Sequence, residues 1–511
     1  MYLGDLLGTR QEDSKDAGRR ILILTWGSPW RTYSTNKNQV QYRWEETKYT
    51  IEIKGNVALE CKSRTTLPVI YKKYSPDRII VFVTDTTIFD SSLFSGDKDY
   101  ESLIRYVEKI YRDFAYEIID SSAKYCDINA DELRDKIEII VAPGTGKYSN
   151  KLQINKETIE LPRMNLCGSI ANYYYFIHGK LSVILYSEVV NLLSKDGESN
   201  KTLQVILDLT HGVNYMPALT YRAIKDLSGV VSIFLKPINL TVLNSEPYTE
   251  GAEGLRIHLV EKTINPRPEK FFFEKDEDPL EVEGSCVKNT EELNKIKADL
   301  EEILRILRID NLEEIRVYAL SIEYGQPLLS LYTLPKASLN CVVDALEKIF
   351  YYFTRVEADF EIRHLVRYTI NASNMFKALF ISDVLKNVFK IGRREEISLK
   401  ELADITGKIN WLDNATKLRI SQELYSIEKI VSSKGICYNE YRKLHEYIGY
   451  EDCSYIEKGE DRFARNLFSH AGLERCVTEI KCEDSKPEKI YLRYASNRLK
   501  YVKETFLKQA S

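Results

Sequence analysis

Short runs of β-branched and aliphatic residues divide the first half of the chain and restrict its fold more than any other feature. Such apolar runs without alternation are typical of strands buried on both faces of a sheet. The segments between them, at residues 97–125, 163–193 and 214–227, have helical periodicity. Strands alternating with helices predict a doubly wound α/β domain with a mostly parallel sheet. The runs are ILILTW from Ile21, RIIVFVTD from Arg78, IEIIVAP from Ile137, QVILDLTHG from Gln204 and VVSIFLKP from Val230.

Two segments interrupt this alternation. Residues 31–54 are polar and rich in Thr and Tyr, and we expect them to form a β-hairpin inserted in the first crossover. After Val260 the sequence INPRPEKFFFEKDEDPLEVEG contains proline and alternating charge without periodicity, as in a linker. We therefore expect a ligand-sensing domain at residues 1–268.

Helical periodicity dominates the remainder of the chain. It begins with NTEELNKIKADLEEILRILRI, in which aliphatic residues recur at helical spacing. We expect linker helices at residues 269–340 and a mostly α-helical domain at residues 341–511. Within that domain, EEISLKELADITGKIN from Glu395 indicates a helix, a turn at Gly407 and a second helix. A helix-turn-helix-like insertion is therefore expected near residues 395–420.

Composition restricts the class of protein. A chain of 511 residues is long enough for two or three domains. Its formal net charge is −4 and its pI about 6.1, so the whole surface is not a cation that coats nucleic acid. Any contact with RNA must therefore be local.

The nine cysteines form no CxxC motif, and no group of His and Cys has the spacing of metal ligands. We expect reduced cysteines, no metal site and no catalytic cofactor. The N-terminus lacks the pattern of a signal peptide, and no uninterrupted apolar stretch is long enough to cross a bilayer. These patterns predict a cytoplasmic protein that does not contact a membrane.

Glycine and small hydroxylated residues follow four of the predicted strands, in TWGS, TDTT, PGTGK and DLTHGVN. In open α/β sheets, ligands bind beyond the carboxyl ends of the strands. Glycine lets backbone amides approach a phosphate, and Ser and Thr add donors. Asn214 is placed to begin a helix, whose N-terminal amides favour an anion. The loops together predict a phosphate-containing ligand, although the spacing of a P-loop and a GxGxxG motif are both missing.

The segment RNLFSHAG, which begins at Arg465, contains the residue types that cleave RNA without a metal. Histidine serves as acid or base near neutral pH, and arginine donates to phosphate oxygens. Five positions on a helix correspond to roughly 140°, so Arg465 and His470 of one helix do not face each other. A site built from two copies across a dimer axis removes this difficulty. Gly472 is placed to end the helix just beyond His470.

TWG, TDT, DLTHGVN and RNLFSHAG occur in an order that resembles the CRISPR-associated CARF and HEPN ribonucleases of type III systems, over nearly the whole chain. The resemblance implies a Rossmann-like CARF domain followed by a mostly α-helical HEPN domain. It also implies a dimer that binds a cyclic oligoadenylate, with cyclic tetra-adenylate expected, across its two-fold axis. The implied catalytic residues are Arg465, His470 and Asn466. The implied ligand-binding residues are Trp26, Gly27, Ser28, Asp85, Thr86, Gly144, Thr145, Thr210, His211, Gly212 and Asn214.

This resemblance favours a metal-independent endoribonuclease that cleaves single-stranded RNA through its 2′-OH in antiviral defence, when a cyclic oligoadenylate activates it. Assembly beyond a homodimer stays open. One alternative is a ligand-responsive regulator that reads DNA with ISLKELADIT, although the following NWLDNATKLR offers few side chains for base edges. Another is a CARF domain that degrades its own activator as a ring nuclease. The other histidines are expected to be packing or surface residues: His178, His258, His364 and His445.

Overall fold

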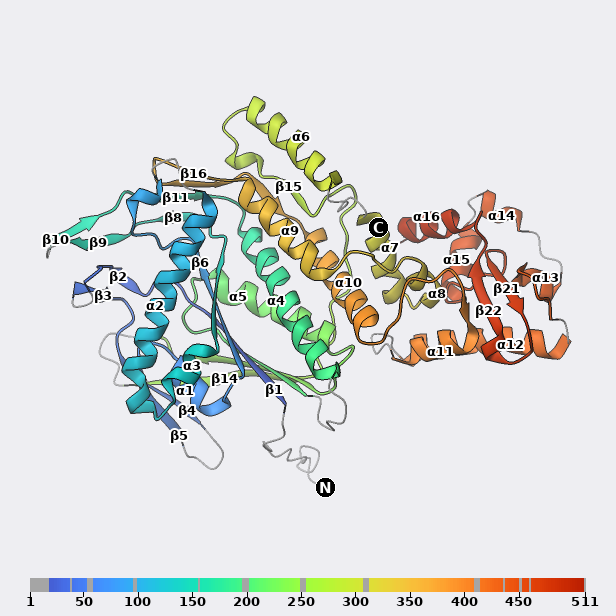
Figure 1. Cartoon of the computed structure of the whole chain (residues 1–511), viewed down its shortest axis with the longest axis horizontal. Coiled ribbons are helices and arrows are strands. Elements are labelled where there is room, and N and C mark those ends of the chain that lie inside the picture. The colour runs from blue at the N-terminus through green and yellow to red at the C-terminus, as the bar shows by residue number, and fades with distance from the viewer. Residues whose placement is uncertain are drawn as a thin grey trace, which may run out of the picture.

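The structure is a computed structural model that describes residues 18–36, 39–52, 58–94, 99–154, 157–194, 202–248, 254–306, 312–408, 414–434, 437–449, 453–458 and 461–509. Figure 1 shows a large N-terminal α/β part and a smaller C-terminal part. Helices α7 (Leu312–Glu323) and α8 (Pro327–Tyr332) lie between them.

An eight-stranded sheet with the order β5-β4-β14-β13-β12-β1-β6-β7 forms the centre of the N-terminal part. Its middle, from β13 to β7, is parallel throughout. Ile21 to Leu24 and Ile79 to Val83 are completely buried, as expected of strands covered on both faces. The predicted mostly parallel sheet is therefore confirmed. The strands are β1 (Arg19–Thr25), β4 (Thr47–Glu52), β5 (Ala58–Ser63), β6 (Arg78–Thr84), β7 (Ile137–Ala142), β12 (Leu203–Asp208), β13 (Ile238–Ser245) and β14 (Leu255–Ile264).

Helices cover both faces of this sheet (Figure 1). One group contains α1 (Leu67–Tyr74), α2 (Tyr100–Cys126) and α3 (Ala130–Asp135), and the other α4 (Ile170–Ser194) and α5 (Tyr215–Val231). Helix α4 is long and apolar enough to span a bilayer, but 61% of its most apolar window is buried inside the protein. The predicted strand from Val230 is wrong: that run ends α5, and the strand begins at Ile238. A buried apolar run alone does not distinguish a helix end from a strand.

The predicted hairpin insertion is confirmed where the structure describes it. β2 (Trp30–Thr32) pairs antiparallel with β3 (Gln41–Tyr42), and β4 pairs antiparallel with β5 at the edge of the main sheet. The end of that prediction, at residues 53–54, lies outside the described residues.

A second sheet joins distant parts of the chain in the order β16-β17-β11-β8. β16 (Thr354–Glu357) and β17 (Glu361–His364) form a hairpin that pairs with β11 (Met164–Cys167), which pairs with β8 (Gly146–Tyr148). Residues 354–364 therefore pack on the N-terminal α/β part, while the expected domain boundaries stay predictions. Two smaller ladders pair β9 (Lys151–Ile154) with β10 (Glu157–Glu160) and β15 (Leu280–Val282) with β18 (Val366–Tyr368).

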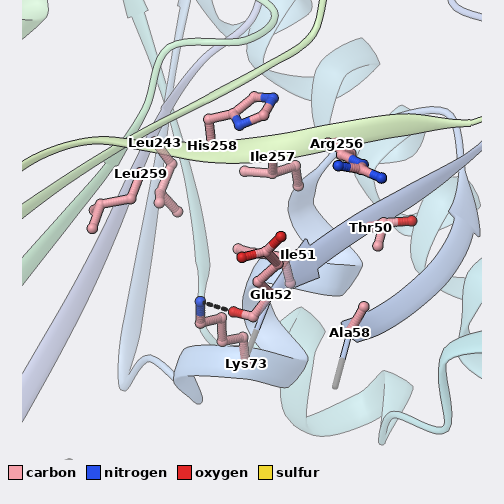
Figure 2. A pocket seen from close by; sticks show the side chains of 10 residues that line it. All are labelled: Thr50, Ile51, Glu52, Ala58, Lys73, Leu243, Arg256, Ile257, His258 and Leu259. Atoms are coloured by element: carbon pink, nitrogen blue, oxygen red, sulfur yellow. Dashed lines mark hydrogen bonds between the residues drawn. The ribbon is translucent and has the colours of Figure 1, made fainter. Parts of the chain in front are cut away.

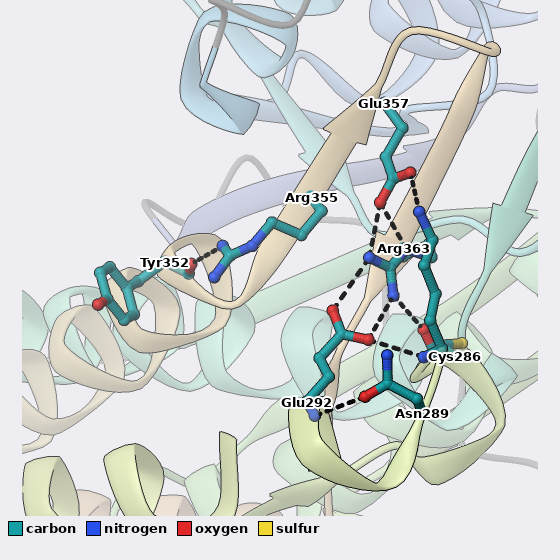
Figure 3. A network of polar contacts seen from close by, with 8 residues as sticks. Cys286, Asn289, Glu292, Tyr352, Arg355, Glu357 and Arg363 are labelled. Atoms are coloured by element: carbon teal, nitrogen blue, oxygen red, sulfur yellow. Dashed lines mark hydrogen bonds and ion pairs between the residues drawn. The ribbon is translucent and has the colours of Figure 1, made fainter. Parts of the chain in front are cut away.

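Arg363 fixes the hairpin to helix α6 (Thr290–Ile306), as Figure 3 shows. Its guanidinium donates to Glu357 at 2.6 Å, to Glu292 of α6 at 3.1 Å and to the Cys286 carbonyl oxygen at 2.7 Å. Only 7% of the Arg363 side chain is exposed. A largely buried guanidinium requires such partners, so this network sets where α6 leaves the α/β part.

A buried charge cluster ties α10 (Ile370–Asn387) to the helices of the N-terminal part. Asp226 of α5 lies 3.3 Å from His178 Nε2 of α4 and 3.1 Å from Lys377 Nζ of α10. All three side chains are at most 3% exposed. Helix α9 (Leu339–Tyr352) packs beside α4 and α10. Residues 339–387 are thus anchored to the α/β part by both packing and charge.

The C-terminal part contains a four-stranded sheet, although we expected residues 341–511 to be mostly α-helical. Its order is β19-β22-β21-β20, and β21 and β22 alternate buried and part-exposed residues, a period-two pattern typical of strands. The strands are β19 (Ile397–Ser398), β20 (Arg442–Lys443), β21 (Thr478–Cys482) and β22 (Ile490–Tyr494). The helices are α11 (Leu399–Lys408), α12 (Asn414–Lys434), α13 (Leu444–Ile448), α14 (Ser454–Glu457), α15 (Asp461–Ser469) and α16 (Leu499–Gln509).

The structure pairs eight of the nine cysteines in disulfides, which contradicts our expectation of reduced cysteines. The partners are 23 to 119 residues apart in the chain, so sequence spacing alone did not reveal them. The exposed Cys341 is the one free thiol. The pairs are Cys61–Cys126, Cys167–Cys286, Cys437–Cys482 and Cys453–Cys476.

We predict that Asp226→Asn lowers the melting temperature of the protein. The substitution removes the charge that compensates buried Lys377, and breaking a buried ion pair costs about 3–5 kcal/mol. Differential scanning calorimetry measures the change. The matched control is Asp344→Asn, at an exposed position of α9, which should leave the melting temperature unchanged. Equal melting temperatures for the two variants would contradict a stabilising role for the cluster.

Candidate functional site

The predicted ligand loops meet at one edge of the main sheet. The Gly27 amide, after β1, donates to the His211 carbonyl oxygen, after β12, at 2.8 Å. The Gly144 amide, after β7, donates to Asp85 Oδ1, after β6, at 2.7 Å. Because β1 pairs with both β6 and β12, the four strand ends are adjacent. The strand order reverses at β1, the position where open α/β sheets bind ligands.

Some predicted side chains point away from this edge into the core. Trp26 is completely buried, with its ring 5.7 Å from that of Phe114. Thr86 is 4% exposed, and its hydroxyl lies 2.8 Å from that of Thr84. These two side chains pack beneath the loops and are too buried to contact a ligand directly.

Asp85 is also completely buried and joins separate segments of the chain. Its Oδ2 accepts a hydrogen bond from the Tyr100 hydroxyl of α2 at 2.6 Å and lies 3.5 Å from His364 Nε2 of β17. Its Oδ1 accepts the Gly144 amide. The sequence pattern placed Asp85 in a ligand loop, but the structure turns its carboxyl group inward.

His211 lies beside the reversal of strand order. Its Nε2 is 3.4 Å from the donating Thr66 amide, which places the ring proton on Nδ1, and its ring is 4.6 Å from that of Trp44. Burial lowers the pKa of His211 to about 3, so the ring is neutral at physiological pH. Thr210 donates its hydroxyl to Asp208 at 2.6 Å, which holds the same loop.

The residues that remain open at this edge are small and polar. Ser28, Thr145, Thr210 and Gly212 are part-exposed, and Asn214 is exposed as the residue that precedes α5. A Cβ at Gly212 would lie 2.5 Å from the Thr25 hydroxyl oxygen, so this tight approach requires glycine. The prediction that Asn214 begins a helix is confirmed. Small polar residues beside a helix N-terminus suit an anionic ligand.

A cavity of about 540 Å³ lies elsewhere, at the outer side of the sheet near β4 and β14 (Figure 2). Lys73 of α1 closes one side and donates to the Glu52 carbonyl oxygen at 2.5 Å. None of the predicted ligand residues lines this cavity. The lining residues are Thr50, Ile51, Glu52, Ala58, Lys73, Leu243, Arg256, Ile257, His258 and Leu259.

The C-terminal candidate residues lie at the end of α15. Arg465 is exposed, and Asn466 and His470 are part-exposed. The His470 amide donates to the Asn466 carbonyl oxygen at 3.0 Å, so His470 continues the last helical turn. Gly472, with φ of 81°, then donates its amide to Leu467 O at 2.8 Å. The predicted glycine cap is confirmed, and it holds the imidazole at the helix C-terminus.

Helix α12 supplies a partner for His470 that the sequence did not reveal. Glu423 Oε2 lies 3.1 Å from His470 Nδ1, and the two side chains are 25% and 31% exposed. The hydrogen bond to Glu423 raises the pKa of His470 above its ordinary value and outweighs the opposing effect of burial. Glu423 precedes His470 by 47 residues and belongs to no recognisable motif, so only tertiary packing identifies it.

Comparison with known proteins gives matches over most of the chain. The family model of the CARF domain of CRISPR system endoribonuclease Csx1 matches residues 21–247, and that of its HEPN domain matches residues 413–497. The CRISPR system endoribonuclease Csx1 of Methanocaldococcus jannaschii is 30% identical over 508 residues, which are 95% of this chain and 92% of that protein. A solved structure, Enterococcus italicus Csm6 bound to cyclic hexa-2'-fluoro-hexa-dAMP, aligns over 96% of this chain and 99% of that chain at 12% identity. The TM-score of this alignment is 0.20, which is too low to indicate a shared fold.

We predict that Glu423→Gln lowers the pKa of His470. An amide does not stabilise the imidazolium as a carboxylate does, so the proton leaves at lower pH. NMR titration of the histidine ring carbon-bound protons measures the midpoint, and six histidines per chain keep assignment practicable. Glu428→Gln, farther along α12, is the control and should leave the midpoint in place. A titration of His470 that is identical in wild type and Glu423→Gln would refute the coupling.

Proposed function

The chain belongs to the CRISPR system endoribonuclease Csx1 family, and on that premise we propose that it is a metal-independent ribonuclease activated by a cyclic oligoadenylate. The observation that carries the catalytic half of this proposal is the pairing of His470 with Glu423 at the open end of α15, beside exposed Arg465. A positioned imidazole and an exposed guanidinium are the groups that RNA cleavage requires.

In the proposed reaction, the 2′-OH of single-stranded RNA attacks the adjacent phosphorus, and the 5′-oxygen leaves. Glu423 favours the protonated form of His470, so this imidazole donates the proton that the leaving oxygen needs. Arg465 binds the non-bridging oxygens as negative charge accumulates on them. Asn466 lies on the same helix and orients Arg465 or the phosphate. The expected product carries a 2′,3′-cyclic phosphate.

A second copy of the chain supplies the base in this proposal. Arg465 and His470 are five positions apart, roughly 140° around a helix, so one α15 does not direct both at the same atom. Two copies related by a two-fold axis bring two histidines and two arginines to one phosphate. Helix α12 contributes Glu423 to this site and packs on α11, which favours a role of this helix pair in the nuclease over DNA reading.

We propose that the activator, expected to be cyclic tetra-adenylate, binds the open edge of the main sheet. Part-exposed Ser28 offers a hydroxyl and exposed Asn214 a side-chain amide to its phosphates, beside the part-exposed loop residues Thr145, Thr210 and Gly212. The neutral ring of His211 adds a donor without charge. Trp26, Asp85 and Thr86 are positioning residues in this proposal, because their side chains are buried.

Activation requires a path from that edge to α15. Asp85 joins the ligand loops to His364 of β17, and the chain continues through β18 into α10. Helix α10 packs on α7, which packs on α16, and α16 packs on α15. These contiguous contacts support a proposal in which the ligand shifts a two-state equilibrium of the nuclease dimer.

We expect the protein to cleave single-stranded RNA in the presence of cyclic tetra-adenylate and EDTA. Arg465→Ala and His470→Ala should each reduce the rate by roughly 10²–10⁴-fold, because each removes a group that acts on the reacting phosphate. Gel analysis of labelled RNA measures the rate, and mass spectrometry identifies the cyclic phosphate. Arg442→Ala, at a surface strand of the same part, is the control and should retain wild-type activity. Full, ligand-dependent activity in both site variants would overturn the proposal.

We expect Asn214→Ala to weaken cyclic tetra-adenylate binding by about tenfold, the effect of one lost hydrogen bond to an anion. The Asn214 side chain makes no cap hydrogen bond to α5, so its removal should not disturb the fold. Isothermal titration calorimetry measures the dissociation constant. Asn191→Ala, at an exposed position near the C-terminal end of α4, provides the matched control and should bind normally. Equal affinities of wild type and Asn214→Ala would exclude Asn214 from the ligand site.

A further inference from the structure

His445, Cys453 and Cys476 converge in the C-terminal part. Their ligand atoms all lie within 4.8 Å of one another, and within the described ranges no other group of histidine, cysteine and acidic residues meets this criterion. Our expectation of no metal site rested on sequence spacing, and it stays a prediction that this cluster makes worth testing. The residues are 8 and 23 positions apart and come from α13, the residue before α14 and the residues before β21. Motif spacing does not detect ligands from three separate segments.

The spacing of His445 and Cys453 matches that of two ligands of a tetrahedral zinc ion. With bonds of about 2.3 Å to sulfur and 2.0–2.1 Å to nitrogen, a tetrahedral ion separates its histidine nitrogen and cysteine sulfur by about 3.6 Å. His445 Nδ1 lies 3.6 Å from Cys453 Sγ. The structure joins the sulfurs of Cys453 and Cys476 to each other, and the same two sulfurs are available to a metal when they are reduced.

Hydrogen bonds around the cluster hold its ligand segments. The buried carboxylate of Glu474 accepts the Cys476 amide at 2.8 Å and the Tyr455 hydroxyl at 2.6 Å. The His445 amide donates to the Arg475 carbonyl oxygen at 3.1 Å, so the segment carrying the imidazole is tied to the segment carrying Cys476. Metal ligands in proteins are commonly oriented by such outer contacts.

We propose that His445, Cys453 and Cys476 form a zinc site in the reduced chain, with two thiolates and one imidazole as ligands. Cys476 is buried, whereas His445 and Cys453 are part-exposed, so water completes the tetrahedron from the solvent side. The disulfide and the zinc complex are alternative states of the same two sulfurs. This inference does not depend on the proposed nuclease activity.

The site would fix the loop that follows His470. The Leu473 amide donates to the His470 carbonyl oxygen at 2.8 Å, and the next residue, Glu474, is buried. Cys476 follows, two residues before β21 begins. A metal bound at Cys476 therefore anchors the far end of this short loop to α13 and to the start of α14. Zinc in such a position has a structural role, separate from the groups that touch RNA.

Metal titration of the full-length protein tests the proposal. The chain is reduced with a phosphine, freed of metal by dialysis against a chelator and titrated with Co²⁺ without oxygen. We expect one Co²⁺ per chain with the thiolate charge-transfer and tetrahedral d–d absorption bands, and displacement by Zn²⁺. Zinc should also raise the melting temperature of the reduced protein by on the order of 5 °C. Absence of cobalt binding would overturn the proposal.

Variants distinguish metal binding at the three-ligand site from metal binding by two thiols alone. His445→Ala keeps both cysteines, and it should abolish the tetrahedral bands and the thermal shift. Glu474→Gln should weaken metal binding by roughly 10–100-fold. Exposed His258 and Cys341 provide matched controls, because His258→Ala and Cys341→Ser should bind like wild type. If Cys476→Ser does not fold, part-exposed His445→Ala still decides the question: metal binding as tight as in wild type would refute the site.

Discussion

Much of the N-terminal architecture depends on the hydrogen bonds that the carboxyl group of Asp85 accepts. It is completely buried, where an unpaired carboxyl group would cost several kcal/mol. Tyr100 on α2 and Gly144 after β7 donate hydrogen bonds to it, and His364 on β17 lies 3.5 Å away. Satisfying this one group therefore fixes a helix and a ligand loop relative to one another, beside a hairpin from the second half of the chain.

The pairing of a histidine with an acidic side chain from a distant segment recurs in this protein. Asp226 meets His178 between α5 and α4, and Glu423 meets His470 between α12 and α15. Burial decides how each pair behaves. Desolvation lowers the pKa of fully buried His178, whereas the carboxylate raises the pKa of part-exposed His470. The first arrangement favours a neutral, packed ring, and the second favours the protonated ring.

Much of the fold was predictable because its signals are local. The buried runs at Ile21, Arg78, Ile137 and Gln204 all became strands, and the helical segments between them became α2, α4 and α5. The strand predicted from Val230 was wrong, because an apolar helix end and a buried strand have similar composition. The sheet in the C-terminal part was not predicted, although β21 and β22 alternate buried and part-exposed residues as strands with one buried face do.

The candidate site residues could be picked out from the sequence alone: the strand-end loops with His211 and Asn214, and Arg465 and His470 at one helix end. Tertiary structure decided what each of them faces. It turned Asp85 inward, brought Glu423 to His470 and gathered His445, Cys453 and Cys476 from three segments. The physical reason is that periodicity and turn chemistry act between neighbours in the chain. Contacts between distant side chains depend instead on how the whole core packs.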